Sequence, residues 1–127
     1  MPGETRYFFD SYALIAFWED SANYRKFELG SGATALTNLM EVQYYLHKKG
    51  KKESDIREAI SDLLPLCIGF SDEDCFEAVK FRFKNKERRM SYTDCLGYTL
   101  AKKSCIKFLT GDKAFEGLPG VEFVRVE

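Results

Sequence analysis

The chain has 127 residues, of which 45% are hydrophobic and 31% charged, and its 19 Lys and Arg residues nearly balance its 20 Asp and Glu residues. This length fits one domain over residues 1–127 with a substantial apolar core, and the composition excludes a disordered tail or a collagen-like repeat. A formal net charge of −1 excludes a uniformly basic nucleic-acid coat, so any contact with RNA or DNA must come from a local patch.

The beginning of the sequence has no pattern of a secretory signal, and no run approaches the roughly 18 apolar residues of a membrane-spanning helix. The four cysteines form no C-x-x-C pair, and His47 is the single histidine. A zinc site is therefore not indicated. We expect a cytoplasmic protein that does not bind membranes and whose cysteines are reduced and mostly packed in the interior.

The first half of the chain alternates short apolar runs with helical periodicities. Strands are predicted at residues 7–9, 33–36 and 66–70. Apolar residues at helical spacing predict helices between these strands, at residues 14–18, 24–29, 39–49 and 56–64.

In the second half, two Ser-x-x-Asp patterns are typical of capping boxes and predict that helices begin at Ser71 and Ser91. Helical spacing predicts the inward-facing apolar residues of these two helices: Phe76, Val79 and Phe83 in the first, and Tyr92, Leu96 and Leu100 in the second. Strands at 107–110 and 121–126 complete the pattern. The alternation predicts an α/β fold, with a mostly parallel five-stranded sheet flanked by helices on both faces.

Four acidic residues fall where a parallel sheet binds ligands. Asp10 follows the first strand, Asp112 follows the strand at 107–110, and Glu41 and Asp94 lie in first turns of helices. Because ligands bind outside the carboxyl ends of such strands, we expect these four residues to gather at one edge. Asp94 faces away from the apolar stripe of its helix, beside small residues that indicate a close-packed surface next to a cleft.

Carboxylates in one cleft have a definite chemistry. Two of them about 4 Å apart repel by roughly 4 kcal/mol at an effective dielectric constant near 20, so such a group takes up protons or binds cations. Oxygen ligands without nearby His or Cys favour Mg²⁺ or Mn²⁺ over zinc. Each acid also has a purely structural interpretation, as part of a helix cap or turn: Asp94 with Ser91, Glu41 with Asn38, Asp112 before a short helix, and Asp10 in a turn.

Four short motifs occur in register along the chain: Phe9-Asp10-Ser11, Glu41 within a helix, Ser91-Tyr92-Thr93-Asp94 opening a helix, and Leu109-Thr110-Gly111-Asp112-x-x-Phe115. Together they resemble the PIN domain family, and within it the small VapC-type toxins of prokaryotic toxin–antitoxin pairs. The resemblance covers essentially the whole chain. It implies an endoribonuclease that uses Mg²⁺ or Mn²⁺ to hydrolyse RNA phosphodiester bonds, forms a homodimer and is silenced by a cognate antitoxin.

By motif match, the resemblance implies a catalytic and metal-binding acidic quartet: Asp10, Glu41, Asp94 and Asp112. Ser11 and Thr110 fall at supporting hydroxyl positions, where they would hydrogen-bond those carboxylates. Glu41 would either bind the metal or orient the attacking water. Many of these toxins have a further acid two residues after the fourth; Ala114 stands there in this chain, which weakens the case for a second fully liganded ion.

Residues 80–89 contain six basic residues and one acid and end just before Ser91, so their last turn is expected near the acids. Phosphate contact by Arg88 and Arg89 is one interpretation, and a solvated helix face is the other. A second basic run, Lys48-Lys49-Gly50-Lys51-Lys52, is interpreted as solvated surface.

Two other functions fit parts of the pattern. A receiver-type phosphoacceptor domain is also an α/β protein with an acidic pocket, but it needs paired acids after the first strand, where this chain has Asp10-Ser11. A catalytically silent PIN-like module that binds nucleic acid or a partner is the second alternative, and the presence of all four acids argues against it.

Overall fold

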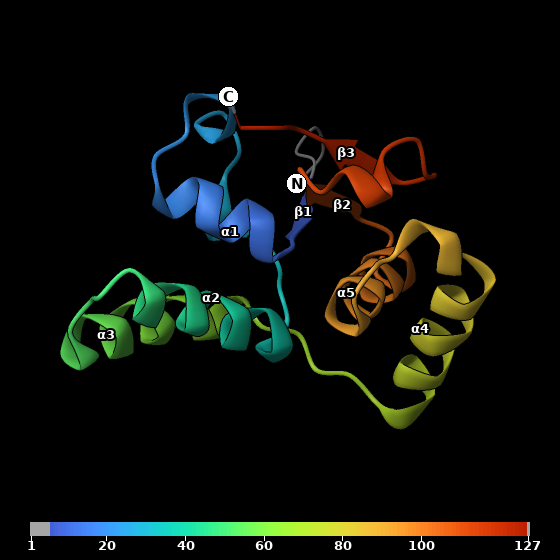
Figure 1. Ribbon diagram of the computed structural model, residues 1–127, viewed down its shortest axis with the longest axis horizontal. Helices are drawn as coiled ribbons and strands as arrows, with labels where there is room; N and C mark the ends of the chain where they lie inside the picture. The colour runs from blue at the N-terminus through green and yellow to red at the C-terminus, as the bar shows by residue number, and fades with distance from the viewer. Residues whose placement is uncertain (1–5, 127) are drawn as a thin grey trace.

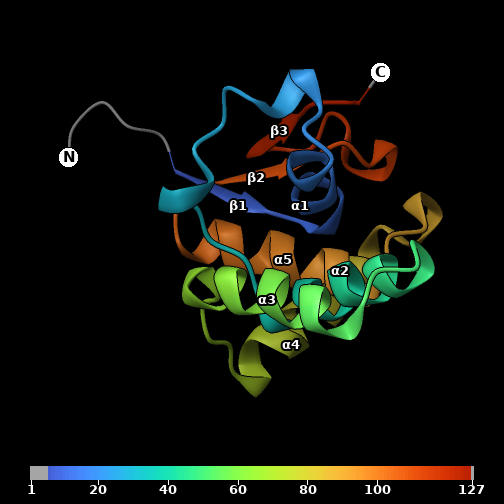
Figure 2. The ribbon, with the colours of Figure 1, turned by 90° about the vertical axis from the view of Figure 1, so that its left-hand side faces the viewer.

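The structure is a computed structural model that describes residues 6–126. Three parallel strands, β1 (Tyr7–Phe9), β2 (Lys107–Thr110) and β3 (Val121–Phe123), form one sheet in the order β1-β2-β3. They lie side by side in Figure 2. Parallel strands need long crossover connections, and helices supply them here.

The prediction of five strands is wrong, because two of the expected strands shrink to single bridges in the described residues. Ala33 bridges to Phe8, and Thr34 bridges to Cys67, both in the parallel sense. A 3₁₀ turn at Leu29–Ser31 and the start of a helix at Leu36 leave the first segment too short for a ladder. The second segment follows the 3₁₀ turn Leu64–Leu66, where Pro65 cannot donate a ladder hydrogen bond.

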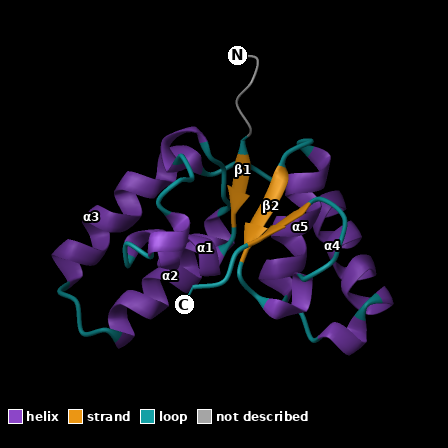
Figure 3. Ribbon diagram, turned by 90° about the horizontal axis from the view of Figure 1, so that it is seen from above, coloured by secondary structure: helices purple, strands orange, loops and turns teal. Residues whose placement is uncertain are grey.

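Five α-helices surround the sheet: α1 (Ser11–Trp18), α2 (Leu36–Lys48), α3 (Glu53–Leu63), α4 (Asp72–Lys84) and α5 (Tyr92–Lys103). Further 3₁₀ turns cover Ala22–Tyr24, Lys86–Arg88 and Lys113–Phe115. The sheet lies between α1, α2 and α3 on one side and α4 and α5 on the other (Figures 1 and 3). The predicted helices on both faces are therefore present.

The side chains of neighbouring strand residues enter separate cores, because they alternate across a sheet. Phe9 and Leu109 pack into the core under α1, α2 and α3. Phe8 and Phe108 pack into the core under α5. The sheet is thus buried on both faces, as expected for a parallel sheet.

Gly97 lets α5 approach the sheet closely. A Cβ atom at Gly97 would lie 2.8 Å from the ring of Phe8 and 3.0 Å from the ring of Phe108. The close-packed surface predicted beside Asp94 is confirmed. Since Asp94 lies one turn before Gly97, this packing fixes the first turn of α5 near the carboxyl ends of the strands.

The predicted inner face of α4 is wrong. Phe76, Val79 and Phe83 are 55%, 49% and 68% exposed, whereas Ala78 on another face of the helix is buried and Phe81 packs partly against the same core. The reason is that α4 packs mainly against α5, so only a narrow stripe of the helix is covered. An apolar stripe therefore faces solvent.

Two further expectations concern the membrane and the cysteines. Among the described residues, no helix combines the length and apolar character that crossing a bilayer requires. All four cysteines are free; Cys95 is buried and Cys67 half-buried, but Cys75 and Cys105 are exposed. The expectation of mostly packed thiols holds for only half of them.

Candidate active site

Asp10 lies directly after β1 and caps α1. Its Oδ1 accepts a hydrogen bond of 2.8 Å from the backbone N–H of Ala13, and the residue is only 1% exposed. Burial raises the pKa of Asp10 to about 8, and the charges of Asp94 and Asp112 add to the rise, against hydrogen bonds from Thr110 and Ala13. Asp10 is therefore a desolvated carboxyl group with two acidic neighbours.

Asp94 belongs to the predicted capping box at the start of α5, which is confirmed. Its Oδ2 accepts from the backbone N–H of Ser91 at 3.3 Å, and Ser91 Oγ accepts from the backbone N–H of Asp94 at 3.0 Å. Burial raises the pKa of Asp94 to about 6, and the nearby charges of Asp112 and Glu41 raise it further against the hydrogen bonds from Ser91. The cap and the acidic neighbours thus act on the same carboxyl group.

The other capping box of the chain shows what a capping role alone produces. Asp74 caps α4 with Ser71 in the same arrangement. The Ser71 backbone hydrogen bond, assisted by Lys103 at 3.0 Å, lowers the pKa of Asp74. The two aspartates have the same local motif and opposite pKa shifts, because acids surround Asp94 and a lysine contacts Asp74. Capping therefore does not account for the surroundings of Asp94.

Asp112 follows β2 through Thr110 and Gly111. Its Oδ1 accepts from the backbone N–H of Ala114 at 3.0 Å, so it caps the 3₁₀ turn as predicted, while Thr110 Oγ1 accepts from the backbone N–H of Asp112 at 3.0 Å. Gly111 passes so close to Tyr12 that a Cβ atom there would lie 2.1 Å from its ring. Only glycine lets the chain turn here and direct Asp112 toward Asp10.

Glu41 lies on α2 and is exposed, and a chain of hydrogen bonds holds it. Ser11 Oγ donates to Glu41 Oε1 at 2.6 Å, and Asn38 Nδ2 donates to Ser11 Oγ at 3.0 Å. Because an ionised carboxylate only accepts, the one hydroxyl proton of Ser11 points to Glu41, and Asn38 must present its NH₂ group to Ser11. This orientation leaves Asn38 Oδ1 buried and without a partner in the described part of the chain.

Sequence reasoning missed the role of Asn38, which was interpreted as a cap paired with Glu41. That interpretation is wrong: the cap position of α2 is Ala35, and no side chain caps it. Asn38 lies inside the first turn, fully buried. The available signal was its spacing, since a polar residue three positions before Glu41 lies on the same face of a helix.

The donor set of this acidic site (Asp10, Glu41, Asp94 and Asp112) is carboxylate oxygen only. Such a set suits a hard divalent cation, and a cation would relieve the unfavourable charge on the buried Asp10 and Asp94. Within residues 6–126, no three carboxylate, imidazole or thiol groups are already arranged to ligate one ion. The residues fit Mg²⁺ or Mn²⁺ in chemistry, and binding would require side-chain adjustment.

The predicted RNA contacts occupy different environments. Arg88 Nη1 donates to the backbone oxygens of Ala114 and Glu116 at 2.8 and 3.3 Å, so it links the turn after α4 to the segment after Asp112. Arg89 is exposed and has a φ angle of 59°. Phosphate contact by either residue stays a prediction.

Comparison with known proteins follows the same outline as the geometry. The PIN domain family pattern matches residues 7–121. A toxin–antitoxin complex from Klebsiella pneumoniae contains a chain with 22% identity and a TM-score of 0.72, covering 94% of this chain and 98% of that one. VapBC2 from Rickettsia felis, bound to a DNA fragment from its promoter, gives 17% identity and a TM-score of 0.67, with coverage of 97% and 100%.

VapBC-5 from Mycobacterium tuberculosis, a member of the VapBC family of toxin–antitoxin systems, gives 19% identity and a TM-score of 0.58, with coverage of 97% and 100%. No protein with curated annotation matches the sequence. The chain belongs to the PIN domain family, which confirms the resemblance found in its motifs. At these identities, the similarity to the toxin structures establishes the fold.

Proposed function

We propose that this PIN domain is an endoribonuclease that uses Mg²⁺ or Mn²⁺ to hydrolyse RNA phosphodiester bonds. The observation that carries the proposal is the mutual influence of the four acids: Asp10 feels the charges of Asp94 and Asp112, and Asp94 feels those of Asp112 and Glu41. A fold that holds acids together at a cost to its own stability is typical of a functional site.

The roles of the residues follow from their surroundings. Asp10, Asp94 and Asp112 hold the cation, directly or through water, while their capping bonds restrict how the carboxyl groups rotate. Such an ion, when bound, supplies Lewis-acid stabilisation of the negative charge that develops on a phosphodiester during hydrolysis. Thr110 supports the carboxyl groups that flank it.

Glu41 has a different role because it is exposed. The Ser11 hydroxyl fixes one of its oxygens, which leaves the other free to bind the ion or to orient the attacking water and accept its proton. Asn38 in turn fixes Ser11.

A partner protein is the second part of the proposal. The apolar stripe of Phe76, Val79 and Phe83 on α4 is exposed, and large exposed apolar patches mark interaction surfaces. Similarity to the toxin chains of toxin–antitoxin complexes supports a toxin that is silenced by a cognate antitoxin in the cytoplasm and that forms a homodimer. Loss of co-purification with the neighbouring gene product in Phe76→Ser/Phe83→Ser would support it, and unchanged co-purification would contradict it.

The alternative is a catalytically silent PIN module that acts by binding nucleic acid or a partner. The two functions differ in metal binding, because a silent module has no use for a cation at the acidic site. A receiver-type phosphoacceptor lacks the second acid after β1, where Ser11 stands and donates to Glu41.

Calorimetric titration of Mn²⁺ into the wild type, Asp94→Asn and Asp74→Asn tests the site. Asp74→Asn is the matched control, since it alters the same residue type in the same capping motif with no acidic site beside it. We expect Mn²⁺ binding in the wild type and in Asp74→Asn, and affinity at least about tenfold weaker in Asp94→Asn. Equal affinities in all three proteins would overturn the assignment of the site.

A further inference from the structure

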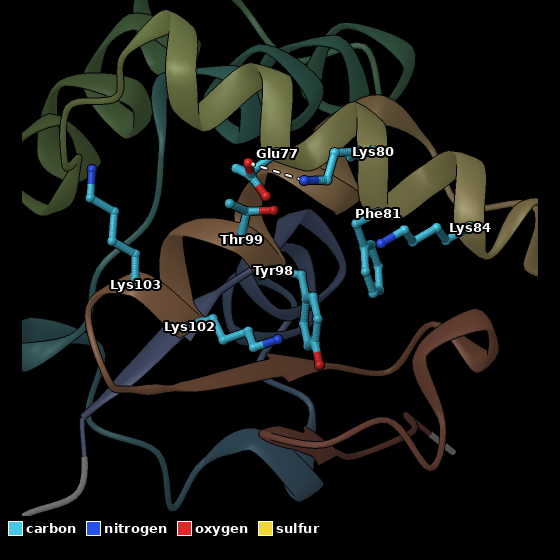
Figure 4. A pocket seen from close by; sticks show the side chains of 8 residues that line it. All are labelled: Glu77, Lys80, Phe81, Lys84, Tyr98, Thr99, Lys102 and Lys103. Atoms are coloured by element: carbon cyan, nitrogen blue, oxygen red, sulfur yellow. Dashed lines mark ion pairs between the residues drawn. The ribbon is translucent and has the colours of Figure 1, made fainter.

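A hollow of about 460 Å³ lies between α4 and α5, away from the carboxyl groups of the acidic site. Four lysines line it, namely Lys80, Lys84, Lys102 and Lys103, and Glu77 is the one acid in its lining. Figure 4 shows these side chains rising from the two helices around the rings of Phe81 and Tyr98. We name this feature the α4–α5 hollow.

The four lysines are not equivalent. Lys80 Nζ is 3.5 Å from Glu77 Oε2, and Lys103 Nζ is 3.0 Å from Asp74 Oδ1. Lys84 and Lys102 have no carboxylate within ion-pair distance among the described residues, and both are exposed. The hollow therefore presents two ammonium groups, one from each helix, that an anionic ligand can contact without breaking an ion pair.

The floor of the hollow is rigid. The rings of Phe81 and Tyr98 are 4.8 Å apart between centroids, and Tyr98 is only 4% exposed, with its hydroxyl donating to the backbone oxygen of Pro119. Lys102 Nζ lies 5.9 Å from the centre of the Tyr98 ring. A cationic rim over a fixed apolar floor favours contact with the charged backbone of a ligand over deep insertion of its base.

The position of the hollow on α5 connects it to the acidic site. Tyr98 lies four residues after Asp94 and Lys102 eight, so all three fall along one stripe of the helix. The acids repel a phosphodiester chain, and its affinity must come from cations nearby. A strand that passes the acidic site can reach Lys102 along this stripe, with Lys84 facing it from α4.

We propose that the α4–α5 hollow binds backbone phosphates of a single-stranded RNA on one side of the bond that is cleaved, through Lys84 and Lys102. The choice of RNA as the ligand rests on the proposed function. Charge alone would also suit an acidic peptide, but the stripe that leads to Asp94 favours the nucleic acid.

Fluorescence anisotropy with a labelled single-stranded RNA of mixed sequence tests this site. The full chain is measured in EDTA, so that the RNA stays intact and no cation at the acidic site contributes to binding. Lys84→Gln/Lys102→Gln is compared with Lys48→Gln/Lys52→Gln, which removes two exposed lysines of the other basic run and gives the same net charge. All four lysines are exposed, so the fold is expected to tolerate both pairs of changes.

Each lost phosphate contact on a single strand lowers the salt slope of log K by about 0.7. We therefore expect Lys84→Gln/Lys102→Gln to flatten the slope by about 1.4 and to weaken binding by about 25-fold at 0.1 M salt. Little change is expected in Lys48→Gln/Lys52→Gln. Equal weakening in the two variants would overturn the hollow as a binding site, and EDTA-sensitive cleavage by the wild type would still support the proposed function.

Two other outcomes separate the proposals. If the hollow variant loses RNA binding while the wild type cleaves no RNA with Mn²⁺, the hollow stands and the nuclease proposal fails. A poly-glutamate peptide that binds as tightly as RNA, and is lost in the same variant, would assign the hollow to an acidic protein segment and overturn the choice of RNA.

Discussion

Replacing Asp10 by Asn is expected to stabilise the metal-free protein and to make its stability less dependent on pH. Burial raises the pKa of Asp10 from 3.8 to about 8. Between these values the folded protein keeps a proton that the unfolded chain releases, so stability falls as the pH rises, by about 1.4 kcal/mol per unit. From pH 3.8 to pH 7 the loss amounts to about 4 kcal/mol.

Asparagine avoids this loss because it does not ionise, and its side-chain oxygen can still accept the capping hydrogen bond from Ala13. Stability is measured by urea unfolding in EDTA, followed by circular dichroism, from pH 4.5 to pH 8. With an m-value of about 2 kcal/mol per molar urea, the midpoint of Asp10→Asn should exceed that of the wild type by about 2 M at pH 7 and by little at pH 4.5.

Saturating Mg²⁺ should narrow this difference, because an ion that binds only the folded wild type stabilises it. A parallel pH dependence in both proteins, or a less stable Asp10→Asn at pH 8, would refute the reasoning that the carboxyl group of Asp10 is held at a cost for function.

Three further predictions concern packing, positioning and the open apolar stripe. Gly97→Ala should destabilise the fold by about 1–3 kcal/mol in thermal melting, because its new methyl group meets a ring at 2.8 Å, whereas Gly69→Ala, with open space around it, should not. Asn38→Leu should leave stability unchanged or slightly higher, since it removes an unpartnered buried oxygen, but lower kcat about tenfold; a matching loss of stability would indicate a purely structural role. Phe76→Ser/Phe83→Ser should change unfolding free energy by no more than about 1 kcal/mol, as both side chains are largely exposed, and a larger loss would place them in the core.

The fold could be predicted from local signals where those signals were also global ones. The capping boxes at Ser71 and Ser91 and the alternation of strands with helices were sufficient for an α/β protein with a buried parallel sheet. Strand number was not predictable, because the apolar runs at 33–36 and 66–70 depend on neighbouring turns for the length of their pairing.

The face of α4 illustrates a second limit. Helical spacing identifies an apolar stripe, but the sequence does not say whether the stripe meets this chain or another molecule. The stripe of Phe76, Val79 and Phe83 is open to solvent, and the hydrophobic periodicity was therefore assigned to the wrong interface.

At the acidic site, the structural and functional interpretations of Asp94 and Asp112 turned out to be compatible. Each caps a helix or turn with one oxygen and also lies among acids. The sequence could suggest this grouping through strand ends, but the Asn38–Ser11–Glu41 chain depends on how α2 packs against α1, which no local pattern reports.

Cleavage of a mixed single-stranded RNA pool by the wild type, Asp94→Asn and Asp74→Asn, with Mn²⁺ and with EDTA, tests the central claim most directly. The account predicts that the wild type and Asp74→Asn cleave RNA, that EDTA abolishes cleavage, and that Asp94→Asn is slower by about a hundredfold or more. Cleavage by Asp94→Asn at the rate of Asp74→Asn, or cleavage that persists in EDTA, would contradict it.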